Sequence, residues 1–175
     1  MYNDQTQAML NASIDFCQDV SNGYQPRWLS FFGSTGIGKT LLSKLVYNYL
    51  KVQNYEYKAR ENNQVVIKKG YKSRNVAILK GFDLVDNLIN DYKYYRKVEI
   101  LLIDDITKGY NGDFFKQKLF QLLEIRTKKW TIITANQGFK YFDKMDASIA
   151  DRFIRDGNQV EELNMPSYSR VKLGI

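Results

Sequence analysis

Histidine is absent from this sequence of 175 residues, and cysteine and proline are scarce. Without histidine the chain cannot use a serine-histidine or cysteine-histidine hydrolase mechanism, nor an imidazole metal ligand. The single cysteine, Cys17, excludes a disulfide or zinc framework within the chain, and favours a buried structural thiol in a reducing compartment. Only Pro26 and Pro166 interrupt the chain, and no low-complexity linker occurs, so we expect one domain over residues 1–175.

Long apolar runs are also missing. No stretch of about 18 apolar residues occurs, which argues against a membrane-spanning helix. The N-terminal sequence MYNDQTQAML contains an acidic residue and no apolar segment, so it resembles neither a signal peptide nor an anchor. We therefore expect a cytoplasmic protein that does not contact a membrane.

Basic residues outnumber acidic residues in this sequence. The sequence has 26 Lys and Arg against 19 Asp and Glu, a formal net charge of +7. Such a balance suggests a polyanionic partner such as nucleic acid. Many small proteins carry a similar charge without binding nucleic acid, so composition alone leaves both interpretations open.

Expected strands and helices alternate along the chain, which is the pattern of a parallel sheet covered by helices. Strands are expected at WLSFF, EILLIDDI and TIITAN, the second of which is apolar enough to be buried on both faces. Helices are expected over residues 6–20, after the glycines near residue 38, and at FFKQKLFQLLEIR. In QVVIKKGYKSRNVAILK, two β-branched runs flank Gly70 and predict a hairpin or two short strands.

The most specific motif is GSTGIGKT at residues 33–40, which fits the spacing G-x-x-x-x-G-K-S/T. Glycines at these positions let consecutive backbone N–H groups point at nucleotide phosphates. Lys39 would reach the β and γ phosphates of ATP, and Thr40 would place its hydroxyl on Mg²⁺. The alternative is a glycine-rich turn without a ligand. The predicted nucleotide-binding residues are Gly33, Ser34, Thr35, Gly36, Ile37, Gly38, Lys39, Thr40 and Leu41.

Two further strands end in polar side chains. Asp104 and Asp105 close ILLIDDI, at the sheet edge where ligands bind in α/β proteins. Asp104 would hold Mg²⁺, and Asp105 would orient or deprotonate an attacking water. Asn136, at the end of TIITAN, fits a residue that positions this water. Carboxylates and asparagine also begin ordinary turns, so these assignments depend on the phosphate loop.

Arg152 stands in a short predicted helix, SIADRFIRDG, where an arginine is usually solvated or paired locally. Arg152 is singled out because of the order of motifs along the chain: the phosphate loop, then Asp104 and Asp105, then Asn136, and then the Asp-Arg pair at 151–152. Through GSTGIGKT, VEILLIDDI, TIITAN, SIADRF and the terminal SYSR, the chain resembles the AAA+ ATPases of the DnaC/DnaI helicase-loader and IstB group over nearly its whole length. The resemblance implies that Asp105, Asn136 and Arg152 are catalytic, with Arg152 acting as an arginine finger toward a neighbouring subunit.

The same resemblance implies a P-loop NTPase fold of the AAA+ (ASCE) type, an α/β three-layer fold with a central parallel sheet, and self-association into a ring or spiral. Against the family pattern, we expect the separate N-terminal module of the loaders to be missing. We also expect no C-terminal helical lid, because the sequence ends soon after SYSR, within a tail at residues 164–175. Arg170 in that tail is a candidate second sensor.

Residues 61–75, ENNQVVIKKGYKSRN, are an insertion relative to these ATPases. The basic residues in it, mixed with Tyr71, suit contact with phosphates and a stacked base of single-stranded DNA. A solvated hairpin whose lysines prevent edge pairing is the alternative. The predicted DNA-binding residues are Lys68, Lys69, Lys72 and Arg74.

The favoured function is an ATPase that places a replicative helicase on single-stranded DNA. An IstB-like regulator acting with a transposase on duplex DNA uses the same ATPase and remains open. A small nucleotide kinase would share the phosphate loop, but its Asp-Arg element should precede the last core strands. A nucleotide-dependent binding module with little hydrolysis is the fourth hypothesis, and the acidic pair argues against it.

Overall fold

The computed structural model describes residues 4–61, 64–107 and 112–164. Its centre is a five-stranded sheet in the order β4-β5-β6-β1-β7, in which all neighbouring strands are parallel. This confirms the α/β fold with a central parallel sheet. The strands are β1 (Trp28–Gly33), β4 (Val76–Lys80), β5 (Ile100–Asp104), β6 (Trp130–Ala135) and β7 (Gln159–Leu163). Only the backbone is described at residues 53–58, 69, 71–72 and 88–89.

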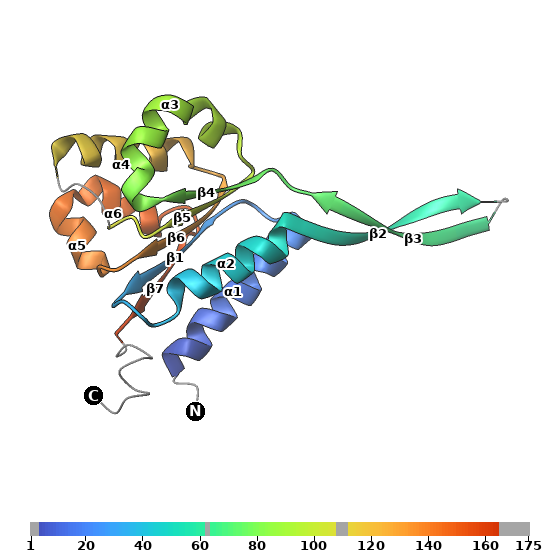
Figure 1. Cartoon of the computed structure of the whole chain (residues 1–175). Helices are drawn as coiled ribbons and strands as arrows, with labels where there is room; N and C mark the ends of the chain where they lie inside the picture. The colour runs from blue at the N-terminus through green and yellow to red at the C-terminus, as the bar shows by residue number, and fades with distance from the viewer. Residues whose placement is uncertain (1–3, 62–63, 108–111, 165–175) are drawn as a thin grey trace.

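Helices cover both faces of the sheet (Figure 1). On one face, α1 and α2 pack Phe16 and Leu50 against Leu29 and Phe31 of β1. The other face is covered by four helices, among whose buried residues is Phe153. Because the three inner strands are buried on both faces, they read as continuous apolar runs. The helices are α1 (Asp4–Asn22), α2 (Lys39–Lys51), η1 (Gly81–Asp83), α3 (Leu84–Lys97), α4 (Asp113–Ile125), α5 (Phe139–Met145) and α6 (Ala147–Ile154).

Strands β2 (Val52–Glu61) and β3 (Gln64–Ser73) form a separate antiparallel sheet, the ribbon, which extends away from the body (Figure 1). Gly70 lies inside β3 opposite Tyr55, so of the two expected alternatives the hairpin around Gly70 is wrong and two separate strands are found, of which β3 has ten residues. The run VAILK is instead the core strand β4. A β-branched run shows strand propensity but not its partner, and pairing over ten residues with the preceding segment satisfies more backbone groups than a short local hairpin.

Arg126, at the end of α4, is completely buried and ties the helical layer to the sheet. Its Nη1 donates hydrogen bonds to backbone oxygens at the end of α3, and its Nη2 and Nε donate to groups where β5 and β6 begin. Burial lowers its pKa to about 9. The acceptors are the backbone oxygens of Tyr95, Val98, Glu99 and Trp130 and the hydroxyl of Thr131, at 2.6–3.2 Å.

Two expectations from composition can be compared with the fold. Cys17 lies on α1, where it is half-buried and packs against the core. Burial raises the pKa of its thiol to about 11, so the thiol is protonated near neutral pH. Within the three described ranges, no helix is long and apolar enough to cross a membrane.

Candidate nucleotide-binding site

The glycine-rich loop joins β1 to α2 at the carboxyl edge of the sheet. Gly33 has φ 137°, and a Cβ atom there would lie 2.1 Å from the backbone oxygen of Leu163 in β7. Any other residue would clash with the neighbouring strand or displace it. The first glycine of the motif is therefore required by the close approach of β7, which lets the chain turn from the sheet into the loop.

Lys39 is the first residue of α2 and only 4% exposed. Its Nζ donates to the backbone oxygens of Gly33 at 3.0 Å and Ser34 at 2.6 Å, and to Oδ1 of Asn136 at 3.0 Å. Burial lowers the pKa of Lys39, while the charges of Asp105 and Asp104 oppose that shift. The ammonium group therefore lies inside the loop and faces the ends of β5 and β6.

Asp104, the last residue of β5, receives hydrogen bonds from two hydroxyl groups. Thr40 Oγ1 donates to its Oδ1 at 2.8 Å, and Thr134 Oγ1 to the same oxygen at 2.9 Å. Lys44, one turn after Thr40, places Nζ 3.6 Å from Oδ2. A carboxylate beside a hydroxyl is the oxygen pair that Mg²⁺ takes when phosphates and waters supply its other ligands, so these residues fit the predicted magnesium site.

Among residues 4–61, 64–107 and 112–164, no group of three or more His, Cys, Asp or Glu side chains could hold a metal ion. A cation at Asp104 would consequently depend on the phosphates of a bound nucleotide for much of its coordination.

Asp105 follows β5 directly and has the left-handed backbone conformation, φ 61°. Its N–H donates to Thr134 Oγ1 at 2.7 Å. Its two carboxylate oxygens accept from different donors, Oδ1 from the Thr107 hydroxyl at 2.9 Å and Oδ2 from Asn136 Nδ2 at 2.7 Å. Gly81 approaches from η1, where a Cβ would lie 1.9 Å from the Asp105 backbone oxygen. The backbone and the carboxylate of Asp105 are therefore both held in place.

Asn136 links the loop to the acidic pair. Its side chain accepts from Lys39 and donates to Asp105, while its backbone N–H donates to Thr107 Oγ1 at 3.0 Å. Together with the contact between Thr40 and Asp104, these bonds bring together five of the predicted site residues from three separate segments. We call Lys39, Thr40, Asp104, Asp105 and Asn136 the P-loop cluster.

Thr107, Thr134 and Lys44 also contact the P-loop cluster, and the sequence interpretation missed them. Alternation along a strand offered a signal for Thr134, because it lies two residues before Asn136 and so shares its face of β6. Nothing in the sequence distinguished Thr107 or Lys44 from the other polar residues of a turn or a helix surface.

Arg152 lies on α6 and is 8% exposed. Its Nη2 forms an ion pair with Glu124 of α4, and its guanidinium carbon lies 4.2 Å from the centre of the Phe120 ring. Its Nε is buried without a hydrogen-bond partner. These contacts connect Arg152 to α4 of its own chain. Arg155, at the end of the same helix, is exposed, with Asp156 3.7 Å away.

The predicted DNA-binding residues do not share one environment. Lys68 forms an ion pair with Glu61 across the ribbon. Arg74 lies at the ribbon base, where it pairs with Glu99 and donates to the backbone oxygen of Val20 at 3.2 Å. The side chains of Lys69 and Lys72, and all of Arg170, lie outside what the structure describes.

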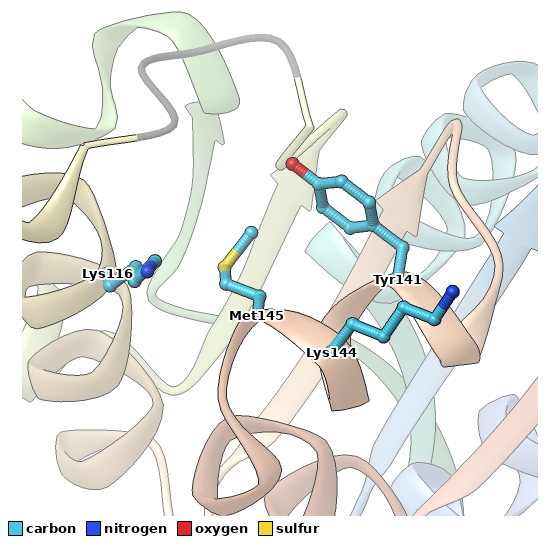
Figure 2. Close-up of a pocket in the computed structure, with 4 residues that line it drawn as sticks. All are labelled: Lys116, Tyr141, Lys144 and Met145. Carbon is cyan, nitrogen blue, oxygen red and sulfur yellow. The ribbon is translucent and has the colours of Figure 1, made fainter.

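An open pocket of about 260 Å³ lies between α4 and α5 (Figure 2). Lys116 of α4 lines one side of it, and Tyr141, Lys144 and Met145 of α5 line the other. The Lys116 ammonium is 3.3 Å from Asp113 in the same helical turn. None of the four lining residues belongs to the P-loop cluster, so the pocket is separate from the predicted nucleotide site.

Comparison with known proteins assigns this geometry to a family. The model for the bacterial DnaA ATPase domain matches residues 3–160. The chain belongs to the bacterial DnaA ATPase domain family. The matched range contains GSTGIGKT, the acidic pair and Asn136, and the match confirms the expected AAA+ resemblance at the level of DnaA/DnaC-type proteins. The narrower assignment to helicase loaders is not established by this match.

Individual DnaA relatives are similar over most of this chain. Chromosomal replication initiator protein DnaA of Buchnera aphidicola subsp. Cinara cedri is 24% identical over 153 residues, and that of Herminiimonas arsenicoxydans 30% over 148 residues. Each match covers 81% of this chain but only 31% and 29% of the relative. The chain therefore spans about a third of the length of these DnaA proteins.

Solved structures share the fold. A replication initiator DnaA bound to AMPPCP and single-stranded DNA has a TM-score of 0.60 at 17% identity, covering 90% of this chain and 47% of that one. The DnaC helicase loader has a TM-score of 0.63 at 17% identity, covering 93% and 92%. Both the initiator and the loader thus match the DnaA-type ATPase fold seen here.

Proposed function

We propose that this DnaA-type domain binds and hydrolyses ATP at the P-loop cluster and uses the cycle in the initiation of DNA replication. The observation that carries the proposal is the carboxylate of Asp105, held by Thr107 and Asn136 within a cluster that also contains Lys39. A carboxylate fixed by two donors beside a phosphate loop is suited to orienting a water for attack on a phosphoryl group.

Each member of the P-loop cluster has a distinct proposed role. The backbone N–H groups of residues 33–41 surround the phosphates. The Nζ of Lys39 leaves the backbone oxygens of Gly33 and Ser34 and donates to the β and γ phosphates instead. Asp105 accepts the proton of the attacking water, and Asn136 positions that water. Thr40 and Asp104 would hold Mg²⁺, which when bound neutralises charge on the β and γ phosphates.

Arg152 is proposed to act on a neighbouring subunit in an ATP-dependent ring or spiral. Arg152 is 8% exposed and is held against α4 by Phe120 and Glu124, so its guanidinium must leave the ion pair with Glu124 to reach the phosphates of another copy. Glu124 is more than half exposed, so a neighbouring copy that approaches α4 can compete for this guanidinium.

For the biological step we propose that the chain places a replicative helicase on single-stranded DNA. The fold likeness to the DnaC loader over nearly all of both chains supports this proposal. An initiator-type role at the origin is the second candidate. The family match and the DnaA relatives favour it, because they name the initiator rather than the loader.

ATP binding and turnover, measured with and without single-stranded DNA, test the site. Lys39→Ala removes a charge-assisted contact worth about 1.5–3 kcal/mol, so we expect ATP to bind roughly 10- to 150-fold more weakly. Asp105→Asn should still bind ATP, while turnover falls about a hundredfold or more. Normal hydrolysis by both variants would show that the site is wrongly assigned.

Capture experiments separate the two biological roles. ATP-dependent capture of the purified replicative helicase of the same source, lost in Lys39→Ala, is expected of a loader. Binding to origin duplex without helicase capture would favour the initiator-type role instead.

A further inference from the structure

The ribbon is regular along its whole length. Val52 to Glu61 pair with Ser73 to Gln64, one residue against one, without a bulge. At about 3.3 Å per residue, ten pairs give an arm roughly 30 Å long. Figure 1 shows this arm standing clear of the sheet and its helices. Its faces are therefore available to a partner over most of the arm.

The described side chains of the ribbon include apolar groups without a core. Val65 and Ile67 are 64% and 66% exposed, and Val52 is 51% exposed. By register and alternation these three share one face, and Arg60 pairs directly with Val65 on that face. A two-stranded ribbon is marginally stable alone in water, so a face that exposes three β-branched residues indicates a surface that is covered in use.

The charge of the ribbon indicates which kind of partner covers this apolar face. Residues 52–73 contain five Lys and Arg residues and two Asp and Glu residues. One of the two acids, Glu61, is paired with Lys68. Arg60 is exposed at the far end of the arm. An excess of basic residues around a short apolar strip is complementary to a polyanion, whereas a protein groove for an apolar face would not need it.

We propose that the ribbon enters the major groove of duplex DNA with the face of Val65, Ile67 and Arg60. The major groove is about 12 Å wide and accepts a two-stranded β-ribbon. The two apolar side chains would lie against thymine methyl groups, and Arg60 would contact a phosphate. Single strands are usually bound in a concave basic groove, which a projecting ribbon does not provide.

This inference changes the DNA-binding set expected from the sequence. Arg74 is committed to Glu99 and Val20 at the base and lies outside the proposed contact, while Arg60, Val65 and Ile67 enter it. It does not rest on the proposed ATPase function, because no residue of the P-loop cluster takes part.

The test is fluorescence anisotropy of the full chain with a labelled duplex of about 30 base pairs and with one of its strands. Losing one phosphate contact in Arg60→Gln should reduce the salt slope for duplex by about 0.9 and weaken binding roughly eightfold at about 0.1 M salt. Val65→Thr/Ile67→Thr keeps β-branched side chains and should weaken duplex binding about threefold or more at an unchanged slope.

Three controls make the result decisive. Arg96→Gln removes one exposed charge from α3 and should leave the duplex slope unchanged. Lys39→Ala should retain duplex binding, which separates failure of this inference from failure of the ATPase proposal. Unchanged duplex binding by the ribbon variants overturns the inference. An equal loss of affinity for the single strand would also overturn it. The same holds if the ribbon variants keep their DNA affinity but no longer capture a protein partner.

Discussion

The P-loop cluster and the ribbon are two ways of presenting polar groups on one chain. In the cluster, Asp105 is held through its backbone N–H and both carboxylate oxygens, and Lys39 has three acceptors. On the ribbon, Arg60 and Val65 face solvent. The cluster is organised before its ligand arrives, while the ribbon gains its contacts from a partner. Substitutions should therefore have large, specific effects in the first region and small effects on the isolated chain in the second.

The largest effect is expected at Arg152, which tests whether the P-loop cluster is complete within one chain. If this guanidinium stabilises phosphoryl charge across a subunit boundary, Arg152→Ala should bind ATP but hydrolyse it about a thousandfold more slowly. Mixing it with Asp105→Asn should restore activity that neither variant has alone, because some interfaces then combine an intact carboxylate with an intact arginine. Steady-state ATPase assays across mixing ratios measure this.

Glu124→Gln is the matched control for Arg152. It breaks the ion pair with α4 but keeps the guanidinium. A purely structural Arg152 would make Glu124→Gln resemble Arg152→Ala in thermal unfolding and in activity. Flat activity at every mixing ratio, with co-assembly demonstrated, would contradict a shared site.

A smaller effect is expected at Thr134, which supports the P-loop cluster without being a predicted catalytic residue. Thr134→Val removes the acceptor of the Asp105 N–H and a donor to Asp104. At about 0.5–1.5 kcal/mol for each bond, turnover should fall roughly tenfold. Thr134→Ser should recover most of it because the hydroxyl returns. Steady-state kinetics should be measured to obtain kcat and KM separately. A change in KM alone would show that Thr134 serves ATP binding rather than the positioning of Asp104 and Asp105.

The smallest effect is expected on the ribbon, when the isolated chain is measured. Val65→Thr/Ile67→Thr alters exposed side chains, so the free energy of unfolding should change by less than about 0.5 kcal/mol per site. ATP turnover without DNA should stay within about twofold of the parent. Scanning calorimetry and the ATPase assay check this. A large drop in Tm would mean that the ribbon face packs within the chain, which would remove the contrast between the two regions.

The sequence allowed the P-loop cluster to be predicted because its members stand at the ends of recognisable strands. Parallel strands bring those ends to one edge, so the sequence alone predicts that Lys39, Asp104 and Asn136 lie together. Thr107 could not be predicted, because its role depends on the left-handed turn at Asp105, which is unusual for a residue other than glycine.

The ribbon was harder to predict than the sheet, for a different reason. Strand propensity marked Val65 to Ile67 correctly, but register depends on which neighbour a strand pairs with, and the described side chains of the ribbon form no buried face that would specify it. Gly70 alone does not mark a turn, because it pairs with Tyr55 inside β3. The ion pair between Arg152 and Glu124 likewise arises from the packing of α6 on α4, which motif spacing does not describe.

The ribbon begins where α2 ends, with Val52 following Lys51 directly. Lys39 and Thr40 stand at the opposite end of the same helix, and Figure 1 shows the ribbon leaving the other end of α2 and extending away from the body. Thirteen helical residues span about 20 Å and the ribbon about 30 Å. A DNA contact at the ribbon tip would lie as far as about 50 Å from the phosphate loop along this path. Any influence of a bound nucleotide on that contact would have to pass through α2, whose Leu50 is packed against β1.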